Sequence, residues 1–132
     1  MNNIIDDIFK LIHSLNWEIE QAPLSSLPSL VDPIRKVLIY NPESITIFHL
    51  VEEYYHIKLE HSGRLLWTDN DERNPHEHEA WNEALSWLKR YWDMNEGGDN
   101  YLKFMEYFGV PYSLETSVIE EFCPANQNIN YV

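Results

Sequence analysis

The chain has 132 residues, of which 44% are hydrophobic, and its aromatic residues comprise 5 Trp, 8 Tyr and 5 Phe. This length and composition exclude a wholly disordered chain and are typical of one domain with a single apolar core. The formal net charge is -13 at pH 7. Because such a charge repels phosphate groups, we expect no direct binding to nucleic acid or to anionic lipid. The charge would suit a basic protein partner, or it would simply keep the protein soluble.

The single cysteine, Cys123, excludes an internal disulfide and is typical of a reducing compartment. The first residues include Asp6 and Asp7 and lack the basic start and apolar stretch of a signal peptide. No stretch of sequence approaches the roughly 20 apolar residues that a membrane span requires. We therefore expect a cytoplasmic protein without a membrane partner.

The first part of the chain predicts one helix and two strands. Residues 3–15 place Ile, Leu and Phe at helical spacing and predict an amphipathic helix. Residues 17–20 alternate between apolar and polar and predict a short strand, whereas residues 23–33 are rich in Pro and Ser and predict a loop. The apolar run at residues 36–40 predicts a buried strand.

A second helix is predicted over residues 43–61. Asn41-Pro42 has the composition of a helix start, in which Asn caps and Pro occupies the first turn. Because this helix is apolar around much of its circumference, we expect it to run through the middle of the domain. Gly63 would end the helix, and residues 64–68 predict a third strand.

Three more helices are predicted in the second half of the chain. The first opens at Asn74-Pro75 and runs to about Trp92, and two short helices follow at residues 100–108 and 113–122. Residues 123–132 show no apolar period and are expected to form a flexible tail. The last helix contains no Lys or Arg and three Glu, which argues against a DNA-recognition helix.

The most informative motif lies in the second predicted helix, where Glu52, Glu53 and His56 fall within little more than one turn. On an α-helix Glu52 and His56 differ by roughly 40° of azimuth, and Glu53 and His56 by about 60°, so all three share a face. The His-Glu-x-x-His signature uses this spacing to present two metal ligands and a general base. His49 lies about 10 Å from His56 along the axis, so we expect it to support the site or contact a substrate. The alternative is a solvated face whose charges keep the chain soluble.

A third metal ligand would have to come from the helix that opens at Pro75. Glu77 shares its side with the apolar stripe of that helix, whereas Glu79 lies among polar residues, so Glu77 is the favoured ligand. The alternative role of Glu77 is local, since it stands at the capping-box position relative to Asn74. His76 and His78 are reserve ligands.

Motifs occur in sequence at Val37–Ser44, Phe48–His56, Glu77–Ala80 and Phe104–Pro111. Together they resemble the ImmA/IrrE family of small gluzincin-like metallopeptidases, especially the short versions carried by phages and mobile elements. The resemblance covers roughly residues 36–122. Many short phage-type members share the Glu-Glu-x-x-His form.

Two features depart from the family pattern. Glu52 stands where most members have the first histidine ligand, and Trp81-Asn82-Glu83 replaces the family's Asn/Asp-x-Phe. Because two carboxylates make a bound zinc a weaker Lewis acid than two histidines do, slow hydrolysis is expected. An empty or inactive site is the alternative.

The resemblance implies one α+β domain over residues 1–122, mostly helical and gluzincin-like, with a small three-stranded sheet packed on a central helix. It makes Glu53 the general base and assigns a divalent metal to Glu52, His56 and Glu77, with zinc expected first and manganese as the alternative. The implied function is a metal-dependent endopeptidase that acts on a regulatory, repressor-like protein. The competing hypothesis is a non-catalytic acidic protein that captures a basic partner.

Overall fold

The computed structural model describes residues 4–59 and 75–123, and for residues 75–77 it describes the backbone alone. The elements of the first range are helix α1 (Ile4–Ser14), strands β1 (Glu18–Gln21), β2 (Ser29–Asp32) and β3 (Val37–Tyr40), and helix α2 (Ile47–Lys58). Those of the second range are α3 (Pro75–Met94), α4 (Tyr101–Phe108), the 3-10 turn η2 (Tyr112–Leu114) and α5 (Glu115–Phe122).

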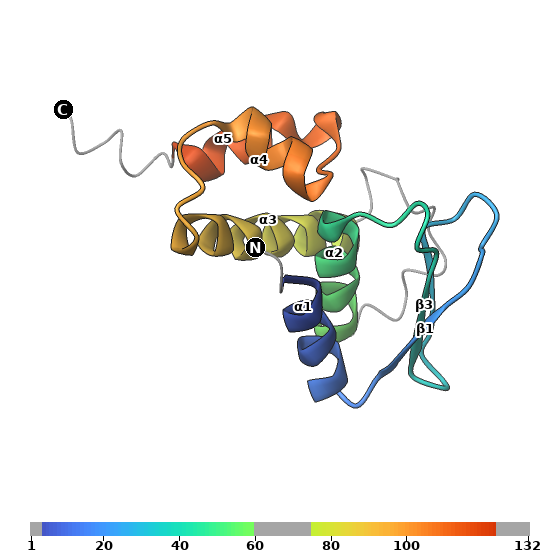
Figure 1. Ribbon diagram of the computed structural model, residues 1–132. Helices are drawn as coiled ribbons and strands as arrows, with labels where there is room; N and C mark the ends of the chain where they lie inside the picture. Colours follow the sequence, from blue (N-terminus) through green and yellow to red (C-terminus); the bar gives the residue numbers. More distant parts are fainter. Residues whose placement is uncertain (1–3, 60–74, 124–132) are drawn as a thin grey trace.

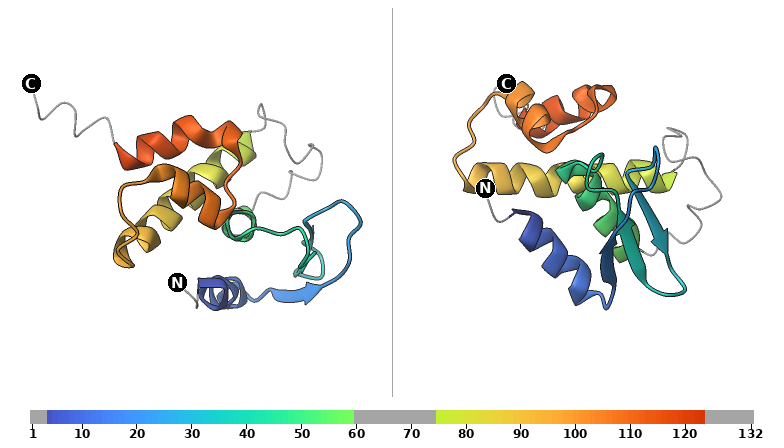
Figure 2. Two further views of the ribbon diagram at one scale, coloured as in Figure 1. Left: turned by 45° about the horizontal axis from the view of Figure 1, so that its top comes forward. Right: turned by 45° about the vertical axis from the view of Figure 1, so that its right-hand side comes forward.

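Helix α3 lies at the centre of the arrangement. Helices α4 and α5 lie on one side of it, and α1 and α2 lie on the other (Figure 1). The small sheet lies beside α2, on the side of the molecule away from α4 and α5 (Figure 2). The expected α+β class, with more helix than strand, is confirmed over the described residues.

The core follows from the apolar faces of the helices. Helix α1 buries Ile4, Ile8 and Ile12, which recur every fourth residue, each with at most 2% of its surface exposed. Helix α3 presents the buried stripe Ala84 and Leu88 to the interior. Helix α2 packs against both α1 and α3, so that it is covered on more than one side.

Two of the three predicted strands are confirmed, but the third strand of the sheet differs from the prediction. The strand order is β1-β3-β2, with β1 parallel and β2 antiparallel to β3. Strand β2 lies inside the segment 23–33, which the composition predicted as a loop, so that prediction is wrong. Pro28 and Pro33 flank β2 and leave its pairing with β3 intact, because proline is tolerated at strand ends. The predicted strand 64–68 lies outside the described residues.

Helix α2 begins later than predicted. Asn41-Pro42 does not start the helix; the side chain of Asn41 instead accepts a hydrogen bond from the Glu43 amide at 3.1 Å and forms a turn. The N-cap is Thr46, whose hydroxyl accepts from the His49 amide at 3.1 Å. The N-cap of α2 is therefore Thr46, five residues after Asn41, the cap that the sequence predicted.

The later helices agree closely with their predictions. Helix α3 starts at Pro75 as expected and continues two residues past Trp92, and Asn100 caps α4 by accepting from two backbone amides. Residues 124–132, most of the expected tail, lie outside the described part of the chain. Within the described ranges, none of the helices has both the length and the apolar character that crossing a membrane requires.

Candidate functional site

The three motif residues of α2 are buried. The exposed fraction is 8% for Glu52, 1% for Glu53 and 3% for His56. Both Oε1 of Glu53 and Nε2 of His56 are inaccessible to solvent. The alternative of a solvated face, in which these charges serve solubility, is therefore wrong.

Burial at these positions follows from the elements that pack around α2. The helix is buried continuously from Leu50 to His56, because α3, α1 and the sheet all lie against it or beside it. Ionisable groups in such a place are stable only when other groups compensate them, since burying an isolated charge costs several kcal/mol or more (about 20 kcal/mol in the idealised limit). The contacts around Glu53 and His49 show part of that compensation.

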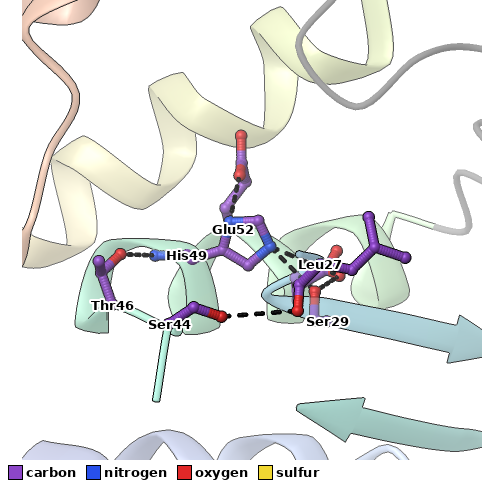
Figure 3. Close-up of polar contacts among 7 residues, drawn as sticks. Leu27, Ser29, Ser44, Thr46, His49 and Glu52 are labelled. Atoms are coloured by element: carbon purple, nitrogen blue, oxygen red, sulfur yellow. Dashed lines mark hydrogen bonds and ion pairs between the residues drawn. The ribbon is translucent and has the colours of Figure 1, made fainter. Parts of the chain in front are cut away.

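Ser29, the first residue of β2, links the sheet to the motif. Its hydroxyl donates to Oε2 of Glu53 at 2.5 Å and lies 2.9 Å from Nε2 of His49 (Figure 3). Ser29 is itself only 5% exposed. The sequence analysis missed this residue, because it placed Ser29 in a loop and no motif contains it.

The imidazole of His49 lies between two carboxylates. Its Nδ1 is 3.8 Å from Oε1 of Glu52, and its Nε2 is 3.9 Å from Oε2 of Glu53. Figure 3 shows Glu52 pointing away from the strands, toward the side on which α3 lies. The side chain of His49 is 23% exposed. It is therefore more accessible to solvent than its neighbours Glu52, Glu53 and Ser29, which are buried.

The residues expected on α3 are only partly placed. The side chains of Glu77 and His76 lie outside the described residues. Glu79 is exposed, as its place among polar residues predicted. His78 is also exposed, and its ring lies tilted against that of Trp81, with 4.3 Å between centroids and 54° between the ring planes.

The described donors fit a divalent metal in chemical type but do not complete a site. Glu52 and His56 offer a carboxylate and an imidazole one turn apart, and both groups are common zinc ligands. Among the side chains that the structure describes, no group of three or more His, Cys, Asp or Glu is arranged to hold a metal.

A neighbouring tyrosine on α2 faces the polar side of α3. Burial raises the pKa of the Tyr55 hydroxyl, and the nearby carboxylate of Glu83 raises it further, while the positive charge of Arg90 and its hydrogen bond to Tyr55 act in the opposite direction. This contact ties the second half of α2 to α3 and so contributes to holding the motif face in place.

The chain matches no protein-family model, no curated protein and no solved structure. The resemblance to the ImmA/IrrE family therefore rests on the sequence motifs alone. The structure adds the burial of Glu52, Glu53 and His56 and the contacts of helix α2.

Proposed function

We propose that this chain is a metal-dependent endopeptidase of the ImmA/IrrE type, with a gluzincin-like α+β domain, that acts on a regulatory, repressor-like protein. The observation that supports the proposal best is the burial of Glu52, Glu53 and His56 on one face of α2. Other positions buried on α2 are apolar or aromatic, such as Phe48 and Val51. Departures from the apolar core rule are typical of functional sites, because the fold alone gains nothing from them.

The proposed roles follow the spacing of the motif. Glu53 accepts a proton from the attacking water and returns it to the leaving amine. Glu52 and His56 would hold the metal together with Glu77, and the bound metal would supply Lewis-acid polarisation of the scissile carbonyl. Zinc is the first choice, because carboxylates and imidazoles are both common zinc ligands. Manganese is the second choice, because two carboxylates shift the preference toward a harder ion.

The charge of the molecule supports a basic substrate. A net charge of -13 attracts a protein with a cationic surface and increases the rate of encounter. DNA-binding repressors carry such surfaces, because they neutralise phosphates with Lys and Arg. The charge is therefore compatible with the substrate class that the resemblance to the ImmA/IrrE family implies, which is a DNA-binding regulator encoded beside the peptidase.

Cleavage by the metal-loaded protein tests the proposal. The purified chain, supplied with Zn²⁺ or Mn²⁺, is incubated with the neighbouring regulator, and fragments are identified by mass spectrometry. We expect cleavage by the wild type, none by Glu53→Gln, and normal cleavage by Glu106→Gln, which removes the same charge from an exposed position on α4. His56→Ala should lose metal in elemental analysis. Absence of cleavage with either metal would contradict the enzymatic function.

A non-catalytic capture protein is the second candidate, and the net charge favours it as well. Under this function the wild type and Glu53→Gln bind the basic regulator equally, and neither cuts it. Binding would weaken strongly as NaCl rises from 50 to about 500 mM, because salt screens attraction between surface charges. Equal binding without fragments would identify this function.

A further inference from the structure

We propose that Ser29 is a positioning residue that holds the Glu53 carboxylate in the orientation a general base requires. The catalytic part of this inference rests on the proposed function, whereas the contact itself does not. Ser29 comes from β2, a strand that lies outside the helix motif, so the small sheet would act as the support of the site.

The contact has the properties of a strong hydrogen bond. The distance from Ser29 Oγ to Glu53 Oε2 is 2.5 Å, and the two residues are only 5% and 1% exposed. Hydrogen bonds to ionised groups are roughly twice as strong as those between neutral groups. Shielding from water strengthens the interaction further, because competing solvent dipoles are absent.

The single proton of the Ser29 hydroxyl gives the contact a direction. An ionised carboxylate can only accept, so the hydroxyl donates to Glu53 and must accept from its other neighbour. That neighbour is Nε2 of His49, at 2.9 Å. With Glu53 ionised, we assign a proton to Nε2 of His49, so that the chain of donors runs from His49 through Ser29 to Glu53.

This arrangement would restrict the rotation of a long side chain. Glu53 has three rotatable bonds, and a general base must stay within hydrogen-bonding reach of the proton it removes. Ser29 itself is held by the pairing of β2 with β3, where it lies opposite Tyr40. Because a displacement of about 1 Å can reduce turnover on the order of 100-fold, a fixed contact of this kind matters for kcat.

The kinetic test compares Ser29→Ala, which removes the hydroxyl, with Ser29→Thr, which keeps it. With the neighbouring regulator as substrate, we expect kcat to fall about 10- to 100-fold in Ser29→Ala, while KM changes less than about twofold and the metal content is unchanged. Ser29→Thr should recover most of the lost kcat. Wild-type kcat in a folded Ser29→Ala, with Glu53→Gln inactive, would overturn the inference and leave the proposed function standing.

A spectroscopic test needs no cleavage. In ¹⁵N-labelled protein at fixed pH, the imidazole signals of His49 should show a proton on Nε2 in the wild type and should shift in Ser29→Ala. His13, whose Nδ1 lies 3.0 Å from the Trp17 carbonyl, is the internal control and should not move. If no metal supports cleavage but His49 shifts as expected, the enzymatic function fails while the hydrogen-bonded chain through Ser29 stands. Unchanged His49 signals in Ser29→Ala would overturn the positioning role.

Discussion

Glu52 determines how the proposed metal site would differ from one built on two histidines. It is 8% exposed, and Oε1 lies 3.8 Å from Nδ1 of His49. A carboxylate here adds negative charge to the site and favours harder cations than zinc. The neighbouring imidazole offsets part of that charge whenever it is protonated.

Glu52→His should therefore change the metal preference of the protein. We expect the variant to retain more zinc relative to manganese than the wild type does, and to cleave the regulator faster, because the bound zinc becomes a stronger Lewis acid. Competition dialysis followed by elemental analysis measures the preference. A Glu52→Gln variant is the control, since it removes the charge without adding an imidazole. An unchanged zinc-to-manganese ratio in Glu52→His would contradict the assignment of position 52 as a ligand.

Tyr55 gives a prediction for alkaline pH. Burial, followed by the charge of Glu83, raises the pKa of its hydroxyl above the ordinary tyrosine value of 10.0. As pH rises through 10, the unfolded state loses this proton before the folded state does. The contribution of Tyr55 to the free energy of unfolding is therefore fully present below about pH 10. It is lost as the pH rises through the higher pKa that the hydroxyl has in the folded protein.

We expect the free energy of unfolding of the wild type to fall more steeply between about pH 9 and 11 than that of Tyr55→Phe. Urea unfolding at several pH values measures the difference in slope. Tyr112→Phe is the matched control, because Tyr112 is 74% exposed. Parallel slopes for the wild type and Tyr55→Phe would contradict the assignment.

At the scale of elements, the end of α4 packs closely against the start of α2. Gly109 ends α4 with a φ of 71°, and a Cβ built on it would lie 2.6 Å from Cβ and Cγ2 of Thr46, the N-cap of α2. A close approach of this kind leaves room only for glycine. The two helices that meet here come from opposite sides of α3.

Gly109→Ala should destabilise the protein for two reasons. The left-handed conformation alone costs a non-glycine residue about 1–2 kcal/mol, and contact with Thr46 adds to that. In a Thr46→Ser background, which keeps the capping hydroxyl and removes Cγ2, the loss caused by Gly109→Ala should be smaller. Urea midpoints of the four proteins form a double-mutant cycle, and a coupling of zero would contradict the close approach.

At the scale of the whole molecule, an aromatic cluster holds α4 and α5 on α3. Phe104 is fully buried and meets the rings of Trp92, Phe108 and Phe122 edge-on, with centroids 5.0 to 5.6 Å apart. Edge-to-face contacts add to the free energy of apolar burial. The cluster is formed without any residue of the proposed site.

Phe104→Ala should reduce the free energy of unfolding by about 3–5 kcal/mol, because it leaves a large cavity between three helices. Tyr112→Ala, at an exposed position of η2, should change it by less than about 0.5 kcal/mol. Denaturant unfolding gives both values. A decrease in the free energy of unfolding of less than about 1 kcal/mol in Phe104→Ala would show that the cluster does not stabilise the packing of α4 and α5 on α3.

Helices α1 and α3 could be predicted from local sequence, because each buries a stripe with a period near 3.6 residues. Ile4, Ile8 and Ile12 in α1 and Ala84 and Leu88 in α3 illustrate this, and all five are buried. The Glu-Glu-x-x-His spacing likewise predicted that Glu52, Glu53 and His56 share one face. These features depend on residues close together in the chain.

Burial of that face, the strand at Ser29–Asp32 and the contact between Ser29 and Glu53 were decided only by the tertiary structure. A strand without a strong alternating pattern forms because β3 supplies its hydrogen-bonding partner, and partners distant in sequence leave no local signal. The link from Ser29 to Glu53 joins residues 24 positions apart. The chain by itself therefore determined its helical faces and its charge, whereas packing determined which of those charges lie in the interior and which side chains hold them there.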